Sequence, residues 1–298
     1  MSTVLAKGVT RTFGAFTAVD RVDIEVAPGE VVGLLGANGA GKTTLIRLLL
    51  GVLRPSAGEV RLFGEPPSGS GAERRRLGYV PQNLGLYRDL TVRENLEFRA
   101  ELFGVEPSQF ARDEPLVLGR IPLGRQRQAA FEAATQHRPD LLILDEPTSG
   151  VSPLARSRLW NVIRQQSEAG VAVLVSTHYM DEAEQADRVV ILAGGRVVAS
   201  GSVAEIIGGR SVVEVTAADW PSALAAVEHD DRVVLLDGRV IRVLGDDLTA
   251  VGADLERAGI RASTRLVPAS LNETLVALSR GAAAGAPDGE PGGAPQSA

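Results

Sequence analysis

A glycine-rich stretch, "GANGAGKTT", has residue types and spacing that suit the binding of a polyphosphate. Gly36, Gly41, Lys42 and Thr43 follow the pattern GxxxxGK[ST]. In such a loop, successive backbone amides bind phosphate oxygens at the start of a helix, where the helix dipole favours anions. The stretch predicts a nucleotide-binding loop made of Gly36, Ala37, Asn38, Gly39, Ala40, Gly41, Lys42, Thr43 and Thr44.

The lysine of this loop is unusual for the composition of the chain. Lys7 and Lys42 are the only lysines, so 29 of the 31 basic residues are arginines. A lysine kept inside the loop fits a site that needs a compact point charge rather than a planar fork. We expect Lys42 to contact the β- and γ-phosphates of ATP and the Thr43 hydroxyl to ligate Mg²⁺.

A second stretch, "LLILDEP", has the form of a buried strand that ends in two carboxylates, Asp145 and Glu146. Buried charges are unfavourable without a partner, which argues for a function. Asp145 would hold Mg²⁺ directly or through water, and Glu146 would act as general base on the attacking water. The alternative is a solvated acidic turn.

The elements that must position these residues alternate along the first two thirds of the chain. Apolar runs predict buried strands at 31–36, 141–146 and 171–176, and Gly194 and Gly195 mark a hairpin turn within 188–201. Helices are expected after the loop, at 91–103, where Thr91 and Glu94 form a capping box, and at 153–170. This alternation predicts an α/β fold with a largely parallel sheet up to residue 208.

Gly208 and Gly209 then interrupt the pattern. Beyond them the order is strand, helix, strand, strand, helix, strand and a final helix, at 212–217, 221–229, 232–236, 240–244, 248–259, 261–267 and 270–280. This order predicts a ferredoxin-like α+β domain over 209–280 with one added helix, the alternative being an extension of the first domain. The composition of 281–298, mostly Gly, Ala and Pro, predicts a disordered tail.

Composition excludes several classes of protein. The net charge of −6 argues against a nucleic-acid surface, and the absence of cysteine excludes disulfides and thiolate metal sites. No signal peptide and no run of the ~20 apolar residues that a membrane helix needs is present. We expect a cytoplasmic protein that reaches a membrane only through a partner.

In the order of these motifs, the chain resembles the ATP-binding subunits of ABC transporters over residues 1–208. "YVPQN" with Gln82 matches the Q-loop, "STHYMDEAE" with His178 the switch histidine, and Phe13 in "TFGAFTAVD" the aromatic that stacks on adenine. The resemblance implies a P-loop ATPase domain with a small antiparallel β subdomain and a helical subdomain. It also implies that Gln82 ligates Mg²⁺ and couples the nucleotide to a permease, and that His178 contacts the γ-phosphate.

The family's LSGGQ signature, which faces the ATP of a neighbouring subunit, is altered. Counting back from Asp145 places it on Ile121–Arg125, "IPLGR", where Pro122 replaces a serine and offers neither a hydroxyl nor an amide donor. We expect Pro122 to be the first residue of a helix. The family's arginine after the motif is Gln128 in this chain, and Arg127 lies one place earlier.

Two other departures involve the same neighbour-facing region. Ser152 replaces the D-loop aspartate, and only 38 residues, 83–120, separate Gln82 from Ile121. This interval is shorter than in the family by about one helix of ~10–14 residues, which predicts a shortened helical subdomain.

The resemblance implies an ATP-hydrolysing subunit, peripheral on the inner face of the cell membrane, that works with a membrane permease and a second ATPase subunit in a homodimer or heterodimer. "PASLNETLVAL" resembles the C-terminal extension of drug and antibiotic exporters, which implies export of a small molecule. A non-hydrolysing regulatory subunit in an asymmetric heterodimer is the alternative. A soluble ABC protein acting on ribosomes or DNA fits less well, because those proteins usually carry two cassettes.

Overall fold

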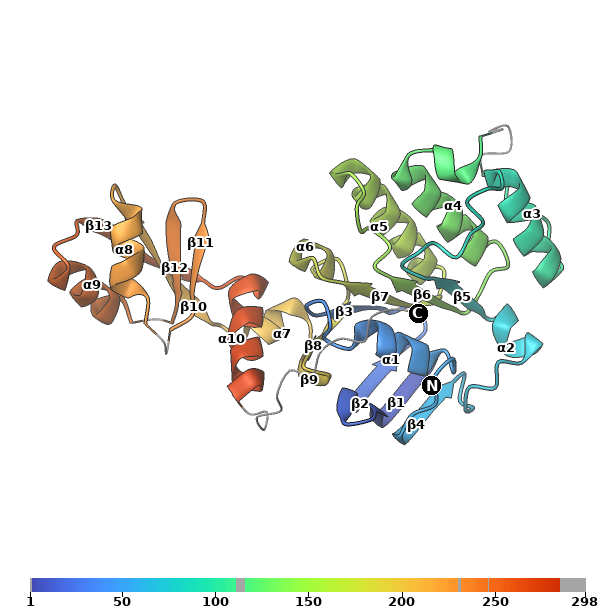
Figure 1. Cartoon of the computed structure of the whole chain (residues 1–298), viewed down its shortest axis with the longest axis horizontal. Helices are drawn as coiled ribbons and strands as arrows, with labels where there is room; N and C mark the ends of the chain where they lie inside the picture. The colour runs from blue at the N-terminus through green and yellow to red at the C-terminus, as the bar shows by residue number, and fades with distance from the viewer. Residues whose placement is uncertain (1, 111–115, 230–231, 246, 285–298) are drawn as a thin grey trace. The chain divides into compact units, whose positions relative to one another are not determined.

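The computed structural model describes residues 2–110, 116–229, 232–245 and 247–284, and Figure 1 shows its helices and strands. The chain forms two compact units, Met1–Gly208 and Gly209–Ala298. No helix in the described ranges combines the length and the apolar character that a membrane span requires.

The centre of the first unit is a six-stranded sheet with the order β5-β6-β7-β3-β8-β9. All neighbouring strands are parallel except β8 and β9, which form the hairpin predicted at Gly194 and Gly195. The strands predicted at 31–36, 141–146 and 171–176 are confirmed, to within one residue at each end. The bounds are β3 Val31–Leu35, β5 Leu77–Val80, β6 Leu141–Asp145, β7 Ala172–Thr177, β8 Arg188–Ala193 and β9 Arg196–Gly201.

Other helices and strands cover both faces of this sheet, as the apolar sequences of its parallel strands require (Figure 1). One face packs against α1 and a three-stranded antiparallel sheet, β2-β1-β4, with Leu45 and Ile143 in the shared core. The other face packs against α4 and α5 through Phe131 and Trp160. The bounds are α1 Lys42–Leu49, β1 Val4–Phe13, β2 Phe16–Val26, β4 Ala57–Leu62, α4 Leu123–Thr135 and α5 Pro153–Glu168.

The region between β5 and β6 is helical. α3, Val92–Phe103, begins with the predicted capping box of Thr91 and Glu94 and packs on α4 through Leu96 and Ala129. α4 begins at Leu123, so the prediction that Pro122 is the first helical residue is wrong by one position. Pro122 is the N-cap, because its ψ of 143° is extended rather than helical. The remaining short helices are α2 Gly71–Arg75, the 3₁₀ turn η1 Leu118–Arg120, α6 Met180–Ala183 and α7 Val203–Ile207.

The second unit contains a four-stranded antiparallel sheet in the order β11-β12-β10-β13. Its elements follow one another in the order expected from the sequence, and α8 and α9 share an apolar core with the sheet. The last helix runs to Ala284, so residues 281–284, predicted as part of a disordered tail, are helical, and 285–298 lie outside the described residues. The bounds are β10 Ser211–Ala217, α8 Trp220–Val227, β11 Val234–Asp237, β12 Val240–Leu244, α9 Leu248–Arg257, β13 Ala262–Pro268 and α10 Leu271–Ala284.

The residues with predicted chemical roles lie at the carboxyl edge of the six-stranded sheet. The glycine-rich loop follows β3, Asp145 ends β6, and His178 follows β7, which lies between these two strands. Ligands of open α/β sheets bind at this edge, outside the carboxyl ends of parallel strands. The fold therefore brings residues from three distant parts of the sequence to one place.

Candidate active site

The loop between β3 and α1 depends on two glycines that pack against other backbone. A Cβ on Gly36 would lie 2.4 Å from the Leu192 carbonyl oxygen, and a Cβ on Gly41 would lie 2.5 Å from that of Ala18. Gly41 also has a φ of 102°, a backbone angle that residues other than glycine rarely adopt. Glycine is therefore required at both positions for the loop to pack this closely against the carbonyls of Leu192 and Ala18.

The amides at the start of α1 form a cradle for an anion. Among the described residues, none of the hydrogen bonds uses the amide of Gly41, Lys42, Thr43 or Thr44 as donor. They are the first amides of a helix, whose dipole places partial positive charge at the same point. The loop therefore fits a polyphosphate.

Lys42 is buried, with 5% of its surface exposed. Its Nζ donates to the carbonyl oxygens of Gly36 at 2.7 Å and Ala37 at 3.1 Å, and lies 3.6 Å from Oε1 of Glu146. Burial lowers the pKa of Lys42, and the Glu146 carboxylate acts in the opposite direction. The ammonium is thus held in place by partners that leave it beside the cradle.

Asp145 connects the end of β6 to the loop. Its Oδ2 accepts a hydrogen bond from the Thr43 hydroxyl at 3.1 Å, and its Oδ1 accepts one from the Ser176 hydroxyl at 2.6 Å. The sequence prediction did not include Ser176, although a hydroxyl at the end of a buried strand is a recognisable signal. The pairing places a carboxylate and a hydroxyl together, which are the hard oxygen ligands that Mg²⁺ prefers.

Glu146 lies at the centre of the site. Its carboxylate accepts a hydrogen bond from Nε2 of Gln82 at 3.1 Å, and its Oε1 lies 3.6 Å from Nδ1 of His178. Its backbone is strained, with a φ of 48°, and its amide donates to the Ser176 hydroxyl at 3.0 Å. Non-glycine residues in this conformation concentrate at functional sites.

His178 is held beside this carboxylate by its neighbour. Its ring packs against that of Tyr179, with the ring centres 4.1 Å apart. Its Nδ1 is buried and has no hydrogen-bond partner within the described part of the chain. This nitrogen lies 3.6 Å from the Glu146 carboxylate, too far for a hydrogen bond.

A cavity of about 640 Å³ opens in front of these residues. Its lining is Phe16, Ala18, Asn38, Gly39, Gly41, Lys42, Thr43, Thr44, Gln82, Glu146, Ser149 and His178. Among the remaining predicted site residues, Asp145 lies behind Thr43, and Gly36, Ala37 and Ala40 shape the loop through their backbone carbonyls.

Phe13, predicted to stack on adenine, does not line the cavity, whereas Phe16 does. The two rings belong to directly paired residues at the β1-β2 turn, and Phe13 packs instead against Arg11, whose guanidinium lies 4.6 Å from the ring centre. Phe16 is 64% exposed at the cavity rim. The structure therefore offers a second aromatic that the sequence analysis did not select.

The altered signature lies away from this chain's own cavity, whose lining includes none of Ile121–Arg125. The described hydrogen bonds leave the amides of Leu123 and Gly124 without an acceptor at the start of α4. Ser152 is the N-cap of α5 and accepts a hydrogen bond from the amide of Ala155 at 3.4 Å. Both segments present helix N-termini.

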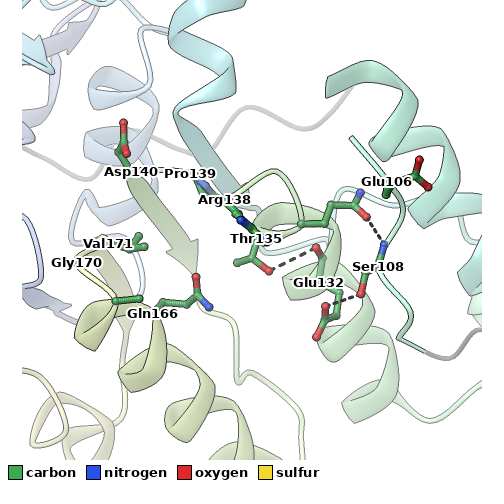
Figure 2. A pocket seen from close by; sticks show the side chains of 12 residues that line it. Glu106, Ser108, Glu132, Thr135, Arg138, Pro139, Asp140, Gln166, Gly170 and Val171 are labelled. Carbon is green, nitrogen blue, oxygen red and sulfur yellow. Dashed lines mark hydrogen bonds between the residues drawn. The ribbon is translucent and has the colours of Figure 1, made fainter. Parts of the chain in front are cut away.

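A separate polar cavity of about 600 Å³ lies where α4 and α5 end. Figure 2 shows Ser108 beside Glu132, whose carboxylate accepts a hydrogen bond from the Ser108 hydroxyl at 2.8 Å. Arg138 and Asp140 also line it, and none of the predicted site residues does. The predicted chemistry is thus confined to the cavity in front of α1.

Comparison with known proteins adds to this geometry. The sequence model of a family described as "ABC transporter" matches residues 19–149. The probable multidrug ABC transporter ATP-binding protein YbhF of Escherichia coli K12 is 39% identical over 213 residues, which are 66% of this chain and 36% of that protein. The chain therefore spans little more than a third of the length of YbhF.

Two further similarities cover most of the other protein. The Nod factor export ATP-binding protein I of Rhizobium etli is 33% identical over 299 residues, covering 93% of both chains. A solved structure described as the ATP binding subunit of an ABC transporter superposes with a TM-score of 0.62 and 30% identity, covering 69% of this chain and 92% of that one.

Proposed function

The chain belongs to the ATP-binding subunits of ABC transporters, a family of ATPases, and we propose that it hydrolyses ATP to power a separate membrane permease. The observation that carries this proposal is the convergence of Lys42, Gln82 and His178 on the Glu146 carboxylate, beside a row of amides that donate none of the described hydrogen bonds. A site for ATP binding alone requires the lysine and the amides. It does not require a carboxylate held between an amide side chain and an imidazole.

We assign the nucleotide's phosphates to the first turn of α1. The amides from Gly41 to Thr44 would donate to phosphate oxygens, and the Lys42 ammonium would neutralise their charge. Thr43, Asp145 and Gln82 would hold Mg²⁺, which when bound neutralises charge on the β- and γ-phosphates. Phe16 or Phe13 would stack on the adenine ring.

Glu146 is the proposed general base. Gln82 donates to one carboxylate oxygen, which leaves the other, near Lys42 and His178, to accept a proton from water. His178 lines the same cavity and would contact the γ-phosphate. The arrangement thus separates the residue that takes the proton from the residues that hold the phosphates.

The partners and the cargo follow from the family and the known relatives. A permease subunit and a second ATPase subunit would complete the transporter, peripheral on the inner face of the cell membrane. The second unit, 209–280, has the element order of a ferredoxin-like fold, and we assign it as an accessory domain. The relatives named for multidrug and Nod factor export support export of a small organic molecule.

The altered signature limits what a homodimer can do. Pro122 contributes no donor, so a neighbour's γ-phosphate would meet only the amides of Leu123 and Gly124 at the start of α4. One lost donor to a developing anion costs on the order of 100- to 1,000-fold in rate. We therefore expect slow hydrolysis in a homodimer and faster hydrolysis beside a subunit whose signature is intact.

Steady-state ATP turnover of the purified chain, alone and reconstituted with its permease in vesicles, tests the proposal. Turnover that rises with the permease supports it. Mg-ATP binding with no turnover in either preparation would overturn it in favour of the regulatory subunit.

The signature has its own test in the same assay. The triple variant Pro122→Ser, Leu123→Gly, Ser152→Asp restores the family pattern, and aspartate is also a good N-cap for α5. A homodimer of this variant should turn over faster than the parent. A parent that already turns over at several per second, with no gain in the variant, would show that "IPLGR" is a working signature.

A further inference from the structure

Arg127, on the second turn of α4, is a buried arginine. Only 7% of its surface is exposed, and none of the ion pairs within the described ranges involves it. Burial lowers the pKa of its guanidinium, and the charge of Glu146 opposes that effect. A buried charge without a carboxylate in contact is unfavourable unless hydrogen bonds compensate, so the partners of Arg127 indicate its purpose.

Those partners are two backbone carbonyls from different segments. Nη1 donates to the carbonyl oxygen of Gln82 at 3.0 Å, and Nη2 donates to that of Ser149 at 3.3 Å. The guanidinium thus bridges the segment after β5 and the segment after β6, while the arginine itself belongs to the helix that follows the signature. The two bonds come from different nitrogens of the planar fork, so the guanidinium reaches acceptors that lie farther apart than those around a single ammonium nitrogen.

Both bridged segments hold Glu146. The side chain of Gln82 donates to the Glu146 carboxylate at 3.1 Å. The amide of Ser149 donates to the Glu146 carbonyl oxygen at 3.2 Å, closing the turn that carries its strained backbone. Arg127 therefore lies behind the proposed general base and touches neither the base nor the cavity, whose lining it does not join.

We propose that Arg127 is a positioning residue that sets the place of Glu146 through Gln82 and Ser149, and thereby links the start of α4 to the nucleotide site of the same chain. This inference rests on the proposed ATPase function. A displacement of α4, whose first amides face the neighbouring subunit's ATP in the proposed dimer, would pull on both carbonyls at once. The two nucleotide sites of a dimer would then communicate through one guanidinium.

Arg127 lies one position before Gln128 on the helix. The family's arginine after the signature corresponds to Gln128, and adjacent residues on a helix point about 100° apart. Gln128 is half-buried, whereas Arg127 is buried and reaches both carbonyls. On this helix, position 127 is thus the one from which an arginine reaches both carbonyls.

Hydrogen exchange of the full-length chain without nucleotide tests the positioning directly. Arg127→Gln should raise exchange in peptides covering 80–86 and 146–152, where turns protect the amides of Leu84, Ser149 and Val151. A peptide covering α1 should be unchanged. Arg127→Lys should raise exchange in at least one of the two segments, because a single ammonium nitrogen replaces the two separate nitrogens that contact the two carbonyls. The control is Arg158→Gln, an exposed arginine on α5.

Kinetics supply the second readout. Arg127→Gln should lower kcat by about 10- to 100-fold, the scale of a small misplacement of a catalytic group, with KM for ATP changed less than about twofold. In a double-mutant cycle with Gln82→Ala, the combined loss should be smaller than the product of the single losses.

Three results would overturn the proposal. Arg127→Gln could leave exchange unchanged in both segments, or raise it equally throughout the first unit. In the double-mutant cycle, the loss in the double variant could equal the product of the two single losses. If the parent chain binds ATP without hydrolysing it, the proposed function fails, whereas the exchange experiment still decides the role of Arg127.

Discussion

Replacement of Glu146 by glutamine tests the chemistry of the site with the least change in shape. The carboxylate lies 3.6 Å from Lys42 Nζ and 3.6 Å from His178 Nδ1, with 11% of its side chain exposed. Glutamine retains the length but cannot take a proton from water. We expect turnover to fall by at least about 100-fold, the scale of a lost general base.

The same substitution should change binding and stability in opposite directions. Two unit charges 3.6 Å apart attract by about 5 kcal/mol at an effective dielectric constant of ~20, although desolvation of both groups offsets much of it. Without the carboxylate, the described partners of Lys42 are reduced to the carbonyls of Gly36 and Ala37, so the nucleotide-free variant should unfold at a lower temperature.

Phosphate oxygens no longer compete with Glu146 for Lys42 in the variant. If about 1.4 kcal/mol of that competition is released, ATP binds about tenfold more tightly. The variant should therefore be less stable than the parent without ATP and gain more stability from saturating Mg-ATP.

Calorimetry with and without Mg-ATP, fluorescence titration and phosphate release measure these three effects. Glu256→Gln, at an exposed glutamate on α9, is the matched control and should change none of them. Unchanged turnover in Glu146→Gln would refute the assignment of the base. Weaker ATP binding would refute the proposed competition for Lys42.

Three other predictions test separate parts of the structure. Lys42→Ala should abolish measurable Mg-ATP binding in a titration of the purified chain, because it removes the only lysine or arginine among the described residues of the cavity lining, and equal affinity would exclude this loop as the phosphate site. Phe16→Ala should weaken ATP binding more than Phe13→Ala if the ring at the cavity rim stacks on adenine, and the reverse order would return that role to Phe13. Asp254→Asn should lower the melting temperature at pH 7, because the hydrogen bond from Arg232 holds the pKa of this carboxyl below its usual value. Its stabilisation is complete above the unfolded pKa of about 3.9 and is lost as the pH falls through the folded value, so calorimetry should find a constant difference from the parent down to about pH 5 that narrows below about pH 4.

The elements whose sequence signals are local were the most predictable. A run such as "VVGLLG" followed by the loop identifies both β3 and the start of α1, and glycine is required there by contacts under 3 Å. The capping box at Thr91 and Glu94 likewise places the start of α3. In each case a few adjacent residues determine the conformation.

The choice between Phe13 and Phe16 could not be made from sequence, since it depends on strand register. β1 and β2 contain three register shifts before their turn, and each shift changes which side chains face a given side. A motif match selects a position in the chain, whereas the bulges decide which ring meets the cavity. The partners of Arg127 were unpredictable for a similar reason, because they are backbone carbonyls from segments that only the fold brings together.

The contrast between a motif's side chains and the backbone that the fold provides also bears on the altered signature. What Pro122 removes is a hydroxyl and an amide, but the helix still begins at Leu123, so two backbone donors and the positive end of the α4 dipole remain. Leu123 also packs against the segment after β6, because a Cβ on Gly150 would lie 3.0 Å from its Cδ2. In the proposed dimer, the surface that would face a neighbour's ATP is therefore in contact with the same segment that Arg127 binds at Ser149. A partner subunit that supplies a complete signature would improve hydrolysis at the site built on Lys42 and Glu146, whereas this chain's own weak signature would leave the partner's site slow. The two sites of such a dimer would differ because Lys42 and Glu146 act on this chain's own ATP, whereas the altered signature acts on the partner's.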